Sequence, residues 1–118
     1  MSQYMILIYG DESAWANMPP EQAEAGYQAY MEYNRDLAVS GVLKSGAQLQ
    51  PSFSATTLRA SAGGVAVHDG PFAESNEQLG GYYIVECASR EDAIAWARRC
   101  PAAAYGAVEV RALATIAG

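Results

Sequence analysis

The chain has 118 residues, of which 51% are hydrophobic and 17% are charged, a composition typical of one globular domain and not of a disordered chain. The formal charge of −6 comes from 13 acidic and 7 scattered basic residues, which argues against nucleic acid and anionic membranes as partners. The chain has no apolar run near the ~20 residues of a membrane span and no basic stretch ahead of its first apolar run. We therefore expect a single cytoplasmic domain over residues 1–118, with both cysteines free.

The first half of the chain predicts a strand, a helix and a second strand. Residues 3–9 are large or β-branched and predict a buried strand. Pro19 and Pro20 suit the first turn of a helix, and Gly41 suits its end. Between them, apolar residues recur every three or four positions, a pattern typical of an amphipathic helix, at Ala23, Tyr27, Tyr30, Met31, Leu37 and Ala38. Residues 42–50 predict a weaker strand.

The second half of the chain predicts a hairpin, a strand, a helix and a last strand. Residues 56–60 and 65–69 flank two glycines and predict the hairpin, while Ser75 to Gln78 have capping-box spacing and predict a short helical turn. Residues 81–88 predict the next strand, Ser89 the cap of a helix that ends before Pro101, and residues 107–116 the last strand. This order predicts an α+β fold, a ferredoxin-like split βαβ with an inserted β-hairpin.

Two of these strands are apolar on both faces. Alternation along the first strand places one set of apolar side chains on each face, Tyr4, Ile6 and Ile8 against Met5, Leu7 and Tyr9, and the strand at 81–88 places Tyr83, Val85 and Cys87 against Tyr82 and Ile84. Two helices cover only one face of such a sheet, so we expect a second copy to cover the other, as a homodimer. The alternative is that residues 51–72 fold over the second face.

The common catalytic and cofactor signatures do not occur in the sequence. A single histidine rules out a histidine cluster for zinc, and neither a glycine-rich phosphate loop nor a GxSxG elbow is present. We expect no cofactor and no bound metal, and the sequence leaves open whether the chain is an enzyme.

Asp69 is the candidate for acid–base chemistry. It shares one face of the 65–69 strand with Val65 and Val67, whereas His68 points the other way. If that face is buried, the Asp69 carboxyl lies at the rim of a core, where it is suited to proton transfer with His68 as an assistant. The alternative is that Asp69 accepts backbone N–H groups in the turn before Gly70. The two roles can coexist.

Three further residues are candidates for binding a substrate. Glu109 and Arg111 lie two apart on the last strand and therefore face the same side. They are either a structural ion pair or, in the sharper interpretation, a site in which the Arg111 guanidinium holds the carboxylate of a small anionic ligand. Tyr30, on the apolar face of the first helix, is either a core residue or the donor of a hydroxyl to a pocket.

Residues 69–83 (DGPFAESNEQLGGYY) resemble the DGPFAETKEQLGG signature of the YCII-related, DGPF-motif proteins, with Ser75 and Asn76 in place of Thr and Lys. The resemblance continues at residues 4–11 (YMILIYGD), 99–106 (RCPAAAYG) and 108–111 (VEVR), with Ala112 where the family usually has proline. The resemblance implies a bacterial protein that forms a dimeric α+β barrel, with two ferredoxin-like sheets packed face to face. Some members of this group are found near or fused to extracytoplasmic-function sigma factors.

The wider superfamily resembles muconolactone isomerase and includes a dehydrochlorinase with a His–Asp pair. Asp69 is the carboxylate that this resemblance offers, whereas Ala29 or Tyr30 stands where those relatives have histidine. Three functions follow as expectations. The first is binding of a small molecule between sheet and helix, near Asp69, Tyr30 and Arg111. The second is cofactor-independent lyase, isomerase or dehalogenase chemistry with Asp69 as general acid/base, and the third is an accessory role for a sigma factor.

Overall fold

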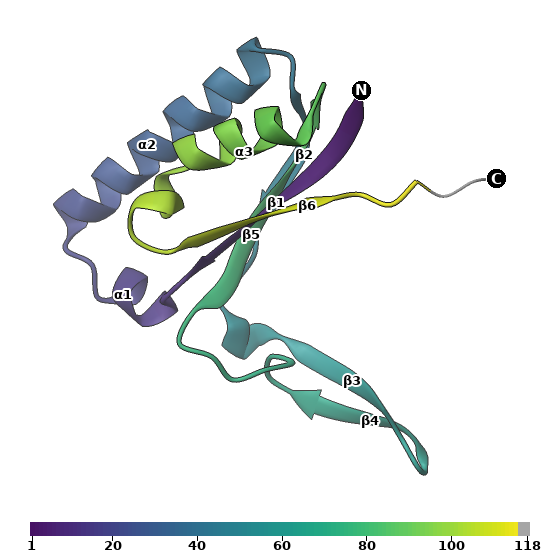
Figure 1. Ribbon diagram of the computed structural model, residues 1–118. Coiled ribbons are helices and arrows are strands. Elements are labelled where there is room, and N and C mark those ends of the chain that lie inside the picture. The colour runs from purple at the N-terminus through teal and green to yellow at the C-terminus, as the bar shows by residue number, and fades with distance from the viewer. Residues whose placement is uncertain (116–118) are drawn as a thin grey trace.

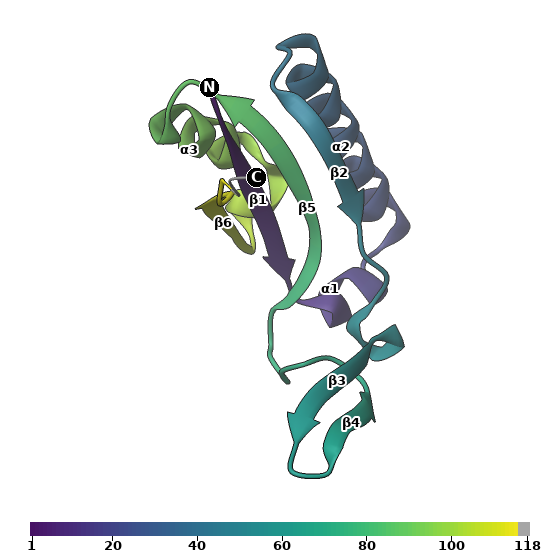
Figure 2. The same ribbon diagram turned by 90° about the vertical axis from the view of Figure 1, so that its right-hand side faces the viewer.

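The structure is a computed structural model that describes residues 1–115 (Figures 1 and 2). A four-stranded antiparallel sheet forms its centre, in the order β2-β5-β1-β6. Its strands are β1 (Ser2–Gly10), β2 (Leu43–Gln48), β5 (Gln78–Cys87) and β6 (Ala107–Ala112). Helix α2 (Pro20–Val39) joins β1 to β2, and helix α3 (Arg90–Arg99) joins β5 to β6. The predicted α+β class with ferredoxin-like connections is confirmed.

The core lies between one face of the sheet and the two long helices (Figure 1). Ile6 of β1, Val85 of β5 and Leu37 of α2 meet there and are fully buried. The Tyr33 hydroxyl donates a hydrogen bond of 2.8 Å to the Trp96 carbonyl, which joins α2 to α3 inside the core. No helix within residues 1–115 is long and apolar enough to span a membrane.

Helix α2 forms as predicted but turns a different stripe to the sheet. Pro20 occupies its first turn, and Gly41, at φ 78°, follows the last turn in the left-handed conformation that glycine adopts most easily. Tyr33 faces the core, whereas the predicted stripe members Tyr27 and Met31 are 59% and 49% exposed. The stripe that faces the core, Tyr30, Tyr33 and Leu37, shares Tyr30 and Leu37 with the predicted stripe, and periodicity alone did not distinguish the two.

Within residues 1–115, no helix covers the other face of the sheet. Met5 pairs with Ile84, and Leu7 with Tyr82, on the opposite side of the strands from the core residues. Both α2 and α3 lie on the core side (Figure 1). We call the helix-free surface formed by Met5, Leu7, Tyr9, Tyr82 and Ile84 the open face.

The inserted hairpin forms a separate two-stranded sheet, β3 (Thr56–Ser61) and β4 (Gly64–Asp69), which we call the arm. It projects from the end of the main sheet toward the side away from the helices (Figures 1 and 2). Every residue of β4 is exposed. The alternative that residues 51–72 fold over the second face is therefore wrong for the single chain.

Several local predictions differ from the structure. The chain forms a short helix α1 (Glu12–Ala16) and two 3-10 helices, η1 (Ser52–Ser54) and η2 (Pro101–Ala104), none of which was predicted. The helical turn expected at Ser75 does not form, because the Ser75 hydroxyl accepts from the Glu77 amide and donates to the Glu77 carbonyl in a local turn. The last strand ends at Ala112 instead of Ile116, which itself lies outside the described residues.

Candidate functional site

The Asp69 carboxylate lies exposed at the base of the arm. Its strand has the predicted alternation, but no core lies beneath it, so the expected position at the rim of a core is not reached in a single chain. The carboxylate also accepts no hydrogen bond from residues 1–115, so the expected Asx-turn is not formed. The turn is held instead by a 2.7 Å bond from the Gly70 amide to the Ala55 carbonyl and a 2.8 Å bond from the Thr57 hydroxyl to the Gly70 carbonyl. His68 is exposed on the opposite face of the same strand.

Glu109 and Arg111 form an ion pair on the open face. The Arg111 Nε lies 2.9 Å from a Glu109 carboxylate oxygen, and the Tyr9 hydroxyl donates to the other oxygen at 3.2 Å. The hydrogen bond from Arg111, followed by that from Tyr9, holds the pKa of Glu109 below its usual range. This arrangement matches the structural ion pair that was one of the two alternatives, because the Arg111 guanidinium is already paired with the Glu109 carboxylate.

The predicted pocket shared by Asp69, Tyr30 and Arg111 does not form within one chain. Arg111 pairs with Met5 on the open face, whereas Tyr30 packs against the core on the other side of the sheet. Asp69 lies on the arm, apart from both. The sheet face to which β6 turns Arg111 and the direction of the arm separate these side chains, and neither could be predicted from local sequence.

Tyr30 is half-buried beside two residues of the η2 region. The Cys100 thiol donates to the Tyr30 hydroxyl at 3.9 Å, and the Tyr105 hydroxyl is also hydrogen-bonded to it. Burial, more than any neighbouring group, raises the pKa of Tyr30 far above its ordinary value of 10.0. The phenol therefore stays protonated near neutral pH, where it can donate a hydrogen bond but cannot serve as a base.

A hollow of about 330 Å³ opens between α1, α2 and the end of η2. We call it the aromatic hollow, and it is lined by Trp15, Met18, Gln22, Ala25, Gly26 and Tyr105. Among the residues that the structure describes, no charged side chain lines it. Its volume falls at the lower end of the ~300–1,000 Å³ of small-molecule sites.

Two neighbouring features shape the aromatic hollow. The rings of Trp15 and Tyr105 meet edge to face with centroids 5.8 Å apart, a favourable aromatic geometry. Gly26 lies beside the indole on α2, and a Cβ there would meet the Trp15 ring at 3.4 Å, an ordinary van der Waals contact. Tyr105 connects the hollow to the Tyr30 hydroxyl behind it.

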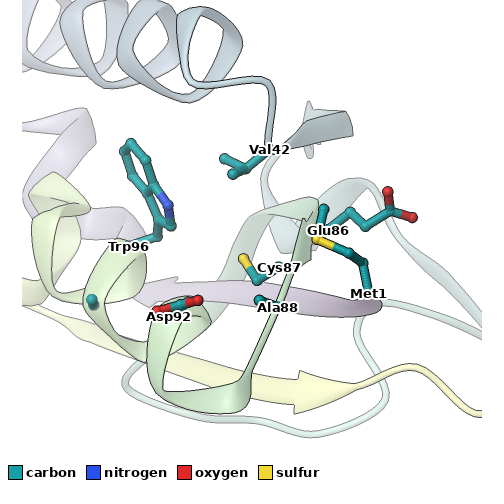
Figure 3. Close-up of a pocket in the computed structure, with 8 residues that line it drawn as sticks. Met1, Val42, Glu86, Cys87, Ala88, Asp92 and Trp96 are labelled. Carbon is teal, nitrogen blue, oxygen red and sulfur yellow. The ribbon is translucent and has the colours of Figure 1, made fainter.

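A second, smaller hollow of about 230 Å³ lies where α3 meets the end of β5 (Figure 3). Cys87, Asp92 and Trp96 lie along it. Burial raises the pKa of the Cys87 thiol, with a smaller contribution from Asp92, so the thiolate that a nucleophile requires is disfavoured. The volume is below the range of most ligand sites. Across residues 1–115, no group of three or more potential metal ligands is found.

Helix α1 links the aromatic hollow to the arm. The Glu12 carboxylate accepts hydrogen bonds from the Ser52 amide at 2.6 Å and the Ser52 hydroxyl at 2.7 Å, a few residues before the arm begins. The Glu12 amide donates to the Gln78 side chain at 2.9 Å. The sequence signal for α1 was the N-cap, in which Asp11 accepts from the Ser13 amide at 2.9 Å.

Comparison with known proteins finds a matching family and a relative of similar length. A protein-family model of the YCII-related domain matches residues 2–116. A protein of Rhizobium meliloti (strain 1021), described as uncharacterised, is 41% identical over 113 residues, covering 94% of this chain and 91% of that protein.

Proposed function

The chain belongs to the YCII-related family, and on that premise we propose that it is a homodimer that binds a small, uncharged, largely apolar molecule in the aromatic hollow. The observation that carries this proposal is the lining of the hollow, in which Trp15 and Tyr105 supply ring surfaces and no residue supplies a charge. A planar ring fits such a lining, because aromatic side chains favour stacked or edge-to-face contacts.

The polarity of the ligand follows from the hydroxyl groups at the hollow. Tyr105 is hydrogen-bonded to Tyr30, and Gln22 contributes an amide. These groups suit one hydroxyl or carbonyl oxygen on the ligand. The anionic ligand expected from Arg111 is less well supported, because that guanidinium is paired with Glu109 on the opposite side of the sheet.

Acid–base catalysis by Asp69 has less support than binding. Its carboxylate is exposed on the arm and faces neither hollow of the single chain. The binding proposal needs only residues that one chain brings together.

The homodimer is supported by the open face. Its apolar side chains have no helix of the same chain over them, and the arm turns away from the sheet (Figures 1 and 2). Two open faces packed together would remove both from water, as symmetric dimers of small proteins commonly do. Sedimentation equilibrium should find twice the 12.5 kDa chain mass at micromolar concentration, and a monomer under these conditions would refute the dimer.

Ligand binding can be tested through the fluorescence of Trp15. The chain has two tryptophans, so Trp96→Phe leaves Trp15 as the only one. Titration with phenol and with benzamide should quench this signal to saturation, whereas benzoate, which is charged, should bind more weakly because no cation lines the hollow.

A matched pair of variants on α2 separates the hollow from the rest of the helix. Gly26→Leu fills the hollow beside the Trp15 ring and should abolish saturable quenching. Ala38→Leu adds the same side chain at an exposed position of α2 and should leave binding unchanged. Equal binding by both variants, or no saturable binding of any probe up to millimolar concentration, would overturn the proposal.

A further inference from the structure

The arm has one face that is mainly apolar and one face that is mainly polar. Cross-strand pairs place an aliphatic surface on one side, formed by Leu58, Ala60, Val65 and Val67. Leu58, Val65 and Val67 are 64%, 64% and 68% exposed. Alternation places Thr57, Arg59 and His68 on the opposite side. A hairpin face with four neighbouring exposed aliphatic side chains is suited to packing against another apolar surface.

The described part of a single chain, residues 1–115, offers no such cover. The arm's strands pair with each other in a separate sheet and project from the body of the molecule (Figures 1 and 2). A lone two-stranded hairpin is at best marginally stable in water, and a long apolar hairpin in solvent invites aggregation. The arm therefore requires a surface from another molecule.

The position of the arm beside the open face argues that this other molecule is a second copy of the chain, because that face already lacks cover from its own helices. A stable interface buries roughly 800 Å² on each partner. The open-face side chains Met5, Leu7 and Ile84 are already half-buried by their neighbours, so they supply only part of that area. The arm leaves the molecule on the same side as the open face and carries more fully exposed aliphatic groups.

We infer that the apolar face of the arm packs against a second copy of this chain, so that each subunit of the dimer clasps the other. This inference rests on the dimer proposed above and adds the arm to its interface. Asp69 lies at the base of the clasping face, across from Thr56. The partner's surface would thus give Asp69 the apolar surroundings that its own chain does not supply.

The test compares two double variants on the same strand. Val65→Ser with Val67→Ser changes the clasping face, whereas Ala66→Ser with His68→Ser changes the opposite face. We expect the first pair to raise the dimer dissociation constant by roughly 100-fold or more, because two arms each lose apolar contacts. The second pair should change it less than about threefold. Sedimentation equilibrium over a dilution series measures both.

Hydrogen exchange on the unmodified protein gives a measurement that does not depend on how the variants fold. Amides of residues 56–69 should be protected at concentrations where the dimer forms and should lose that protection on dilution. Leu7→Arg on the open face serves as a reference that disrupts the dimer without touching the arm.

The outcomes separate the two proposals. If the wild type is a monomer at micromolar concentration, the dimer and the clasp both fail. The clasp alone is overturned if the wild type is a dimer that Leu7→Arg dissociates, but the arm takes no part in it. In that case the Val65/Val67 variant retains the wild-type dissociation constant, and the arm amides exchange freely.

Discussion

Gly106→Ala tests how closely the backbone after η2 approaches β1. A Cβ at position 106 would lie 2.5 Å from the Tyr9 carbonyl oxygen and 3.5 Å from the Ala102 carbonyl oxygen. Both atoms belong to the backbone, and β1 is held by strands on both sides, so the clash has no flexible side chain to relieve it. A shift of about half an ångström in a packed interior should cost about 2–3 kcal/mol of unfolding free energy.

Urea unfolding followed by circular dichroism measures this loss, with all proteins at one concentration because dimerisation adds to apparent stability. Gly63→Ala is the matched control, since a Cβ there meets nothing within 4 Å, and it should stay within about 0.5 kcal/mol of the wild type. The melting temperature of Gly106→Ala should fall by about 8–12 °C. A Gly106→Ala variant as stable as Gly63→Ala would refute the close approach of the two segments.

Three further measurements test the core and its helices. Ser89 accepts from the Asp92 amide at 3.2 Å as the N-cap of α3, so Ser89→Ala should lower the unfolding free energy by about 1 kcal/mol, and Ser89→Asp should restore most of it in the same urea assay. Tyr33→Phe removes the donor to the Trp96 carbonyl and should cost about 1–2 kcal/mol, and no loss would mean that water replaces the bond. Burial raises the pKa of the Cys100 thiol above its ordinary 9.0, so the unfolded state releases this proton first. The contribution of this thiol to stability should be fully present below pH 9.0 and be lost as the pH rises through the folded-state pKa; Cys100→Ala should reduce the alkaline slope, and an unchanged slope would contradict the burial.

The main sheet and its two long helices could be predicted because their signals are local. Strand alternation in β1 and β5, the prolines before α2 and the Ser89 cap each act within a few residues. Helix α1 was missed because it has only five residues and its N-cap, Asp11, directly follows a strand. The direction of the arm depends on contacts such as that between Glu12 and Ser52, which no local pattern encodes.

The candidate site was predicted only in part for the same reason. Tyr30 was named, and the structure places it beside Tyr105 at the aromatic hollow. Trp15 and Tyr105 were missed because they come from opposite ends of the chain and meet only after folding. Gly26 was the available signal, since a glycine inside a helix often marks a close approach of another group.

Helix α1 couples two parts of the protein that are far apart in sequence. Its Trp15 ring forms a wall of the aromatic hollow, and its Glu12 carboxylate accepts two hydrogen bonds from Ser52 just ahead of the arm. Glu12 and Trp15 are three residues apart on this five-residue helix, so the two contacts lie within one helical turn of each other. Helix α1 therefore ties one wall of the aromatic hollow directly to the segment that precedes the arm.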